Sequence, residues 1–432
     1  MSKTTKLFAA VSLLFVLTGL LISWNQALFI LNFALVSAIM ALGVNIQWGY
    51  AGLFNTGIMG FAALGGLSVA LVSAPPVRES WAAGGSGIVL GLLIGLATLI
   101  AGVQVWKRMA KGRARTLTLL AVLLVGFVAF RMVFDPAVSA VEAINPSVTG
   151  NLGGLGLPVL LAWPIGGLLA AAAAWAIGKT ALGLRSDYLA IATLGIAEII
   201  IAVMKNEDWL GRGVKMMNLS ERPWPVPYEV ELQKADWFLS LAHGIGADPV
   251  TFSSIFVKLV YMVMILAVLA SIIWLSERAL KSPWGRMMRA IRDNEDAARA
   301  MGKDVTARHL QVFILGSALC GVAGAILTSM DGILNPGTYQ PLRFTFLIWV
   351  MVIVGGSGNN WGAVLGALLI GWLWLIVEAL GPQIMGFVTM GLSEGPLKAH
   401  LVDSAQHMRL LSLGVILLLV LRFSPRGLIP EK

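Results

Sequence analysis

Residues 285–302, GRMMRAIRDNEDAARAMG, form a charged island between two apolar runs, SIFVKLVYMVMILAVLASIIWL at 254–275 and LQVFILGSALCGVAGAILTSM at 310–330. Each run has about the 20 residues that a helix needs to cross about 30 Å of hydrocarbon. The island carries basic, acidic and small residues: Arg286, Arg289, Arg292, Arg299, Asp293, Glu295, Asp296, Ala297, Ala298, Ala300 and Gly302. The stretch therefore predicts two membrane-spanning helices joined by a structured polar segment.

The rest of the chain repeats this pattern. Its 432 residues are 58% hydrophobic and 12% charged, with a mean hydropathy of +0.83, whereas soluble proteins carry about 25% charged residues. The apolar runs are 7–23, 27–47, 51–74, 88–106, 116–134, 157–178, 186–204, 254–275, 310–330, 344–355, 361–380 and 410–422. Because these runs are continuous and do not alternate, a β-barrel is disfavoured. The sequence predicts an all-α polytopic membrane protein with about 10–12 transmembrane helices and a single domain over residues 1–432.

Lysine and arginine are unevenly distributed over the connecting loops. If the N-terminus lies in the cytoplasm, 20 of the 31 lysine and arginine residues fall on cytoplasmic segments. They are Lys3, Lys6, Lys107, Arg108, Lys111, Arg113, Arg115, Lys179, Arg185, Arg278, Lys281, Arg286, Arg289, Arg292, Arg299, Lys303, Arg308, Arg422, Arg426 and Lys432. Loop 205–253 has seven acidic residues against five basic ones. This bias predicts that both termini are cytoplasmic and that loop 205–253 is external, and it explains the net charge of +9 without a nucleic-acid partner.

Glycine is concentrated in two segments, one in each half of the chain. Gly49, Gly52, Gly57, Gly60, Gly65 and Gly66 form the first group, and Gly355, Gly356, Gly358, Gly362 and Gly366 form the second. Glycine lets membrane helices approach closely or break, and broken backbone survives in the membrane only where it is buried in protein or lines a cavity. Two such segments predict a translocation pathway where they meet. Ordinary close packing is the alternative interpretation.

The second group indicates a broken helix. Residues 344–355 are too few to span the membrane alone, and residues 355–360, GGSGNN, have the composition of a turn. We therefore expect a re-entrant or broken element, followed by a helix at 361–380.

Glu198 is a rare ionisable residue inside an apolar run, LAIATLGIAEIIIAV at 189–203. A charge at the bilayer centre costs roughly 2.5–3.5 kcal/mol on insertion scales, so such residues face a cavity or a partner. Two interpretations stay open, a carboxylate that lines or gates the pathway and an interhelical hydrogen bond or salt bridge. The pathway residues expected from these patterns are Asn55, Gly57, Gly60, Thr193, Glu198, Gly355, Gly356 and Ser357.

The charged island predicts two short helices that together form a docking surface for a soluble partner. Asp293 or Asn294 would cap the second helix, Gly302 would end it, and Asp304 would cap the helix that follows. We expect the arginines of the first helix to point outward and the alanines of the second to form a narrow face. The residues expected to couple the chain to its partner are Arg286, Arg289, Arg292, Glu295, Asp296, Ala297, Ala298 and Gly302.

The sequence offers no catalytic or metal-binding motif, and we expect no cofactor and no enzymatic activity. Gly178-Lys179-Thr180 ends like a phosphate-binding loop, but residue 173 is alanine where that motif needs glycine. The four histidines lack metal-ligand spacing. The single cysteine, Cys320, lies in an apolar run and is expected to be a small packing residue. ATP hydrolysis, if the chain uses it, would have to occur on another subunit.

Several blocks resemble a known family. Asp296-Ala297-Ala298, with Gly302 four residues on, is similar to the Glu-Ala-Ala…Gly motif of ABC importer membrane subunits, with aspartate in the first place. Five blocks together resemble the permease subunit of branched-chain amino acid importers: residues 45–66, 184–200, 285–327, 352–369 and 423–430. Residues 76–156 fall outside this resemblance and are expected to be an inserted helical hairpin. Residues 276–309 would be the cytoplasmic coupling region.

The resemblance implies an importer in the bacterial inner membrane that works by alternating access. Its partners would be a second homologous permease subunit, two cytoplasmic ATPase subunits, an external solute-binding protein and membrane lipid. The substrates expected are branched-chain or other small hydrophobic amino acids. The sequence LGRGV at 210–214 departs from the glycine-rich run common in that family, so urea or short amides are an alternative substrate class. A proton- or ion-coupled secondary transporter that uses Glu198 and a membrane scaffold without transport are the alternatives from other classes.

Overall fold

The computed structural model describes residues 3–145, 150–219, 225–391 and 395–431. The longer helices are α1 (Lys3–Leu21), α2 (Trp24–Val44), α3 (Ile58–Ser73), α5 (Ser86–Arg108), α6 (Arg113–Glu142), α7 (Val159–Ala181), α8 (Ser186–Asn206), α12 (Pro249–Lys281), α15 (Val305–Asp331), α17 (Asn360–Val388) and α19 (Met408–Phe423). The shorter helices are α4 (Arg78–Ser80), α9 (Asp208–Gly211), α10 (Glu229–Leu232), α11 (Asp236–Gly244), α13 (Pro283–Asp293), α14 (Glu295–Ala300), α16 (Leu347–Gly355) and α18 (Pro396–Asp403). The two strands are β1 (Met217–Asn218) and β2 (Ile333–Leu334), and wider π-helical turns cover Asn45–Gly49, Trp81–Gly85 and Leu342–Phe346.

Helices α2 and α15 form the centre of the bundle. α15 packs against α7, α3 and α2, and α2 also packs against α12 and α17. In the most apolar stretch of each helix, 89% of the residues are buried in α2 and 61% in α15, but only 6% in α6. Small residues make the central contacts, because Gly324 of α15 lies against the main chain of Ala62 in α3, and Gly321 lies against Gly166 of α7. Cys320 is fully buried there, as expected for a packing residue.

Nine of the described helical segments are long and apolar enough to cross a membrane, or ten if the bent pair α18 and α19 counts as one span. The prediction of an all-α polytopic membrane protein is therefore confirmed. Two expected spans are too short to cross alone. α3 begins only at Ile58 because residues 52–57 are not helical, and the segment Leu342–Gly355 ends at the expected turn.

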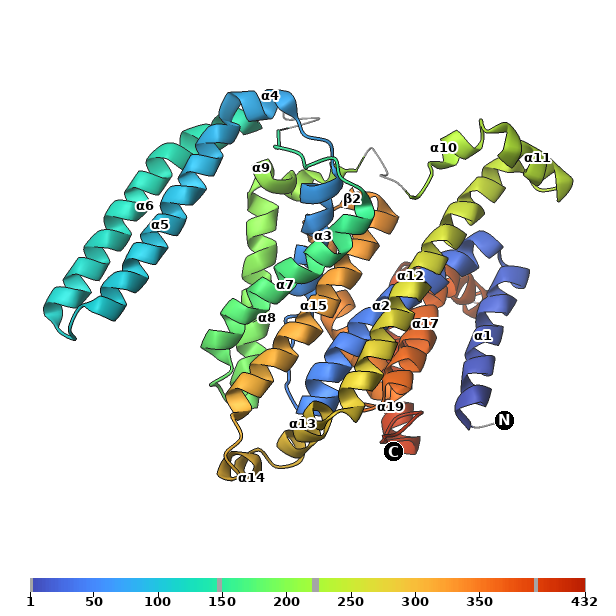
Figure 1. Ribbon diagram of the computed structural model, residues 1–432. Helices are drawn as coiled ribbons and strands as arrows, with labels where there is room; N and C mark the ends of the chain where they lie inside the picture. Colours follow the sequence, from blue (N-terminus) through green and yellow to red (C-terminus); the bar gives the residue numbers. More distant parts are fainter. Residues whose placement is uncertain (1–2, 146–149, 220–224, 392–394, 432) are drawn as a thin grey trace.

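The two ends of the bundle carry different elements (Figure 1). Helices α13 and α14 lie at one end together with both ends of the chain, and α9, α10, α11 and β2 lie at the other. β1 and β2 pair antiparallel, with Met217 opposite Leu334. Segment 205–253, expected to be an external loop, therefore lies at the end opposite the charged island, and residues 220–224 of it fall outside the described residues.

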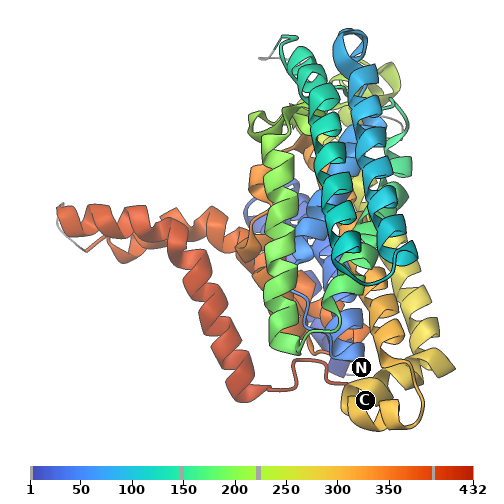
Figure 2. The ribbon, with the colours of Figure 1, turned by 90° about the vertical axis from the view of Figure 1, so that its left-hand side faces the viewer.

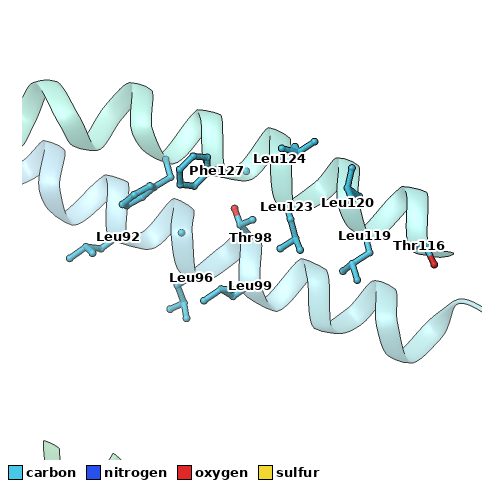
Figure 3. A pocket seen from close by; sticks show the side chains of 13 residues that line it. Leu92, Leu96, Thr98, Leu99, Thr116, Leu119, Leu120, Leu123, Leu124 and Phe127 are labelled. Atoms are coloured by element: carbon cyan, nitrogen blue, oxygen red, sulfur yellow. The ribbon is translucent and has the colours of Figure 1, made fainter. Parts of the chain in front are cut away.

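Helices α5 and α6 form an antiparallel hairpin that leans away from the bundle (Figure 1). An apolar groove of about 880 Å³ runs along it, lined by leucines such as Leu92, Leu99 and Leu123 (Figure 3). Near the turn, the Arg115 guanidinium lies 4.1 Å from the ring centroid of Trp106. Exposed leucines with a tryptophan and arginine near the helix ends are typical of a segment that contacts lipid.

The C-terminal helices leave the bundle on another side. Figure 2 shows the red helices after the middle of α17 extending sideways before α19 turns back toward the end that carries α13. The tail after α19 then returns to the bundle, where Leu428 N donates to Val354 O at 2.9 Å and Ile429 N donates to Gly355 O at 2.9 Å. The tail thus pairs with the last turn of α16.

Candidate coupling and translocation site

Helices α14 and α15 have the caps that the sequence predicts. Asn294 Oδ1 accepts from Ala297 N at 2.9 Å at the start of α14, and Asp304 Oδ1 accepts from Ala307 N at 2.9 Å at the start of α15. Gly302 has φ = 74°, in the left-handed region that favours glycine, and the chain turns there. Arg299 and Glu295 form an ion pair of 2.6 Å on the exposed side of α14. The island is therefore a pair of ordered helices.

Small apolar residues form one part of the exposed surface of α14. Ala297 and Ala300 are exposed, and the Met301 side chain directly after the helix is 79% exposed. Ala298 instead faces the bundle and is half-buried. The alanine face thus exists, but without Ala298, and Met301 extends it. Glu295 and Asp296 lie exposed at the N-terminal turn of α14, where negative charge is favourable.

The arginines of α13 do not all point outward, which corrects the sequence-based expectation. Arg286 is exposed, but Arg289 is half-buried, with Nη2 3.5 Å from Leu280 O, and the Arg292 side chain is only 24% exposed. Met288 and Ile291 are buried beneath the helix. Residues 285, 288 and 292 are three and four positions apart, so they share one helix face, and this spacing could have identified Arg292 as inward-facing.

Arg292 connects α13 to two other parts of the chain. Its Nη1 donates to Gly49 O at 2.5 Å and to Glu431 Oε2 at 2.8 Å. Its Nε donates to Asp293 Oδ1 at 3.1 Å. Burial alone would lower the pKa of Arg292, but the hydrogen bonds and charges of Glu431 and Asp293 together raise the pKa. Arg292 therefore fixes α13 to the C-terminal end of the α2 segment and to the tail.

A buried polar cluster begins next to Gly49 and follows the first helix break. Asn55 Nδ2 donates to Gln47 Oε1 at 2.9 Å. Gln47 Nε2 in turn donates to Phe313 O at 2.9 Å and to Ser317 Oγ at 3.2 Å in α15. Gly57 N donates to Asn55 Oδ1 at 2.9 Å and closes the turn before α3. Backbone groups of residues 52–57 thus bond partly to main-chain carbonyls and partly to side chains, and irregular backbone in a membrane needs such partners.

Helix α8 packs against this break through Thr193. Thr56 N donates to Thr193 Oγ1 at 3.2 Å, and Thr56 Oγ1 donates to Ala190 O at 2.6 Å. A Cβ at Gly57 would lie 2.6 Å from Thr193 O, and one at Gly60 would lie 2.8 Å from the Cα of Ala197. Four of the expected pathway residues, Asn55, Gly57, Gly60 and Thr193, therefore lie together.

The second break joins the first. Trp349 Nε1 donates to Asn55 O at 3.0 Å, and Thr345 Oγ1 donates to Thr56 O at 3.1 Å. At the far end of α16, Gly358 N donates to Asn45 Oδ1 at 2.9 Å. The two glycine-interrupted segments meet, as the sequence predicts.

Positive φ angles let the second break form. Gly356 has φ = 116° and Gly358 has φ = 78°, conformations that residues with a side chain rarely adopt. Gly355 and Gly356 are buried against the tail, and Ser357 is half-buried beside them. These residues lie at the α13 end of the cluster, because Gly358 and Arg292 both contact Glu431.

Glu198 does not join this cluster. The buried side of α8 contains Thr193, Ala197 and Ile201, whereas Glu198 is exposed on another side of the helix, as Tyr188 is.

The sequence analysis missed Asn45, Gln47 and Asn360, which are buried and hydrogen-bonded in this cluster. For Asn45 and Gln47 the signal was present, since amides inside an apolar run need partners in the membrane. Among the described residues, no group of three or more histidine, cysteine or carboxylate side chains could hold a metal.

Two membrane helices interrupted by glycine-containing turns that meet inside a helical bundle are typical of transport proteins as a class. Residues 122–421 match the family model described as the branched-chain amino acid transport system / permease component. The chain belongs to this family. The candidate spans and this family identify a multi-pass protein of the inner membrane.

Curated relatives agree with the family. The chain is 28% identical over 297 residues to the high-affinity branched-chain amino acid transport system permease protein LivM of Salmonella typhimurium, which covers 67% of this chain and 61% of the relative. The LivM protein of Escherichia coli gives the same identity and coverage. A probable LivM protein of Methanocaldococcus jannaschii is 30% identical over 156 residues, 36% of this chain and 42% of the relative. The chain thus spans about three fifths of the first two relatives, and no solved structure matches it.

Proposed function

We propose that the chain is the permease subunit of an ATP-driven importer that moves branched-chain or other small hydrophobic amino acids into the cytoplasm. A second homologous permease, two cytoplasmic ATPase subunits and an external solute-binding protein would complete the complex. The observation that carries this proposal is the continuous link from an exposed docking helix, α14, through Arg292 to the meeting point of the two broken segments. Such a link transmits a movement of α13 and α14 to the pathway.

Movement at this link would produce alternating access. ATP binding would draw the ATPases together and displace α13 with α14. Because Arg292 binds Gly49 O at one break and Glu431 beside the other, both breaks would shift together. A ligand changes an equilibrium only through its different affinity for the two states, so ATP acts here by binding better to the closed ATPase pair.

Reconstitution tests the proposal directly. The chain, the second permease, the ATPases and the solute-binding protein would be placed in liposomes with labelled leucine, valine, urea or acetamide. We expect uptake of leucine and valine that requires ATP. Uptake of urea or acetamide instead would indicate the alternative substrate class, and gradient-driven uptake by this chain alone would contradict ATP coupling.

Substitution of Met301 by glutamate should separate the ATPases from the permease. Met301 is 79% exposed beside Ala297 and Ala300, and burying an unpaired charge at an interface costs several kcal/mol. We expect co-purification of the ATPase subunits and ATP-dependent uptake both to fall at least about tenfold. Met301→Leu is the matched control and should keep both. Normal co-purification with Met301→Glu would show that this face docks nothing.

The exposed position of Glu198 on a membrane helix is a further observation in favour of a second permease subunit. Its carboxylate is exposed on α8 together with Tyr188 and Ile191. A charged group on a membrane helix faces a cavity or partner and not lipid tails, so this face of α8 would border the shared pathway. Glu198→Gln should lower uptake several-fold and leave the assembly intact. Wild-type uptake by this variant would refute a role for the charge.

A further inference from the structure

The hairpin of α5 and α6 leaves its apolar groove open. The two helices pack against each other, and α6 contacts other elements at α4 and α9, at the end away from the hairpin turn (Figure 1). The side chains of Leu96, Leu99 and Leu120, which line the groove, are 54%, 63% and 56% exposed. The bundle therefore does not cover this groove.

The wall of the groove is hydrocarbon. Of the 13 residues that line it, only Thr98 and Thr116 carry a polar side chain (Figure 3). Both hydroxyls donate inside their own helices, Thr98 Oγ1 to Ile94 O at 2.8 Å and Thr116 Oγ1 to Gly112 O at 3.5 Å. The groove therefore suits an apolar chain.

The groove continues toward the hairpin turn. A smaller cavity of about 260 Å³ shares Leu99, Leu119 and Leu123 with it and reaches Trp106. Between Leu92 and Trp106 the helix rises about 21 Å, at about 1.5 Å per residue. One leaflet of the hydrocarbon core is about 15 Å deep, so the groove is long enough for an acyl chain that crosses one leaflet.

Positive charge is concentrated at the turn, where the groove ends. Five basic residues lie in the nine positions 107–115, whereas residues 80–134 contain no aspartate or glutamate. Asp135, the next carboxylate along the chain, lies toward the other end of α6 and pairs with Arg131 at 2.7 Å. Clusters of four to eight lysine and arginine residues beside a membrane helix are typical of sites for anionic lipid headgroups.

Two of the five basic residues lie at the mouth of the groove. Arg113 precedes Thr116 by three positions, and Lys107 follows Val103 by four, so each shares a helix face with a residue of the wall. Both basic side chains are exposed. Trp106 lies next to Lys107, and tryptophan is enriched at the level of the lipid headgroups. The apolar wall and the basic mouth therefore meet where a lipid changes from hydrocarbon to headgroup.

We propose that the groove binds an acyl chain of an anionic phospholipid, whose phosphate is held by Lys107 and Arg113. The apolar wall supplies affinity for the chain, and the basic side chains supply the preference for a headgroup with net negative charge. An apolar helix of another protein would match the wall but leave the basic cluster unpaired, whereas a phospholipid matches both. This site does not depend on the proposed function, because the chain alone forms it.

Photo-crosslinking to the full-length chain in phosphatidylcholine nanodiscs tests this site. The probe is phosphatidylglycerol with a diazirine on one acyl chain, and mass spectrometry maps the crosslinked residues. We expect crosslinks within residues 92–130, and unlabelled phosphatidylglycerol should compete at least about tenfold more effectively than zwitterionic phosphatidylethanolamine. Equal competition by the two lipids, or crosslinks spread evenly over the apolar surface of the chain, would overturn the proposal.

Two further measurements separate a lipid from other occupants. Inorganic phosphate and glycerol 3-phosphate carry the anion without the chains and should not displace the probe. Displacement by either would show that the basic cluster binds a free anion and not a lipid. The crosslinks should also persist when partner subunits are added, and their loss on assembly would show that a protein covers the groove.

Charge-removing variants test the mouth of the groove. The double variant Lys107→Gln with Arg113→Gln should lower crosslinking within the groove at least about tenfold, because each basic residue strengthens the attraction to an anionic headgroup. Lys3→Gln with Lys6→Gln removes the same charge at exposed positions at the start of α1 and should leave the crosslinks unchanged. Equal losses in the two double variants would show a general attraction of anionic lipid and overturn the assignment.

A variant that keeps every charge tests the wall. Leu99 lines both the groove and the smaller cavity and is 63% exposed, so Leu99→Trp should fill them and lower crosslinking several-fold at an unchanged thermal unfolding temperature. Wild-type crosslinking by this variant would show that the acyl chain lies elsewhere.

Discussion

Arg292→Ala should reduce ATP-dependent uptake at least about tenfold while ATP hydrolysis by the assembled complex continues. Arg292 is the residue that holds α13 to Gly49 O and to Glu431. Hydrogen bonds to charged groups contribute about 1.5–3 kcal/mol, and about 1.4 kcal/mol corresponds to a tenfold change in an equilibrium constant. In the proposed complex, a movement of α13 and α14 would no longer reach the broken segments without this connection. Uptake per ATP hydrolysed in proteoliposomes is the measurement.

Two further variants make this prediction specific. Arg185→Ala removes an exposed arginine just before α8 and should change neither uptake nor hydrolysis. Glu431→Gln should reproduce part of the Arg292 defect, and the double variant should show a coupling energy of about 0.5–3 kcal/mol in thermal unfolding. Additive effects of the two substitutions would contradict a direct Arg292–Glu431 interaction. Equal losses in the Arg185 and Arg292 variants would show that the effect is one of charge alone.

Gly324→Ala should prevent formation of a stable bundle. A Cβ at this position would lie 2.6 Å from the carbonyl carbon of Ala62 and 2.7 Å from its Cα, and both are main-chain atoms that cannot rotate away. Helices α3 and α15 would have to separate, at a cost of about 3 kcal/mol or more, because overpacking a dense core is destabilising. We expect most of the protein to be lost as aggregate in detergent, and the remainder to unfold at a lower temperature.

Gly195→Ala is the matched control. Gly195 also lies inside a helix, α8, but a Cβ there would meet nothing within 4 Å. Both substitutions gain about 1 kcal/mol of helix propensity, so the two variants differ chiefly in the space available. Gly195→Ala should therefore behave as wild type or be slightly more stable. Equal stability of the two variants would show that α3 and α15 are not in close contact.

Local features were predictable from the sequence, and long-range contacts were not. The caps Asn294 and Asp304 depend on neighbours three residues away, so the residue pattern alone indicates them. The two glycine-rich breaks were predicted for the same reason. The contact between Trp349 and Asn55 joins residues 294 positions apart, and no local pattern specifies which side chain of one break meets the other.

The side of a helix on which a residue lies was the second feature that the sequence analysis did not predict well. Glu198 was expected near the pathway because it is charged and lies in an apolar run. It follows Thr193 by five positions and so lies outside the cluster that the two breaks form, and its place on the pathway stays a prediction. Arg292 was expected outside because it is charged, but it shares a face with Met288. For Arg292, residue type outweighed helical spacing in the prediction, although the spacing was available in the sequence.

The position of the tail in the chain bears on biosynthesis. Residues 428–431, which pair with α16 and bind Arg292, leave the ribosome after every helix that they connect. All the helices can therefore enter the bilayer before the link between α13 and the second break exists. A nascent or truncated chain would be inserted but would lack the connection between α13 and the second break, so the coupling proposed above could act only after translation has passed residue 431.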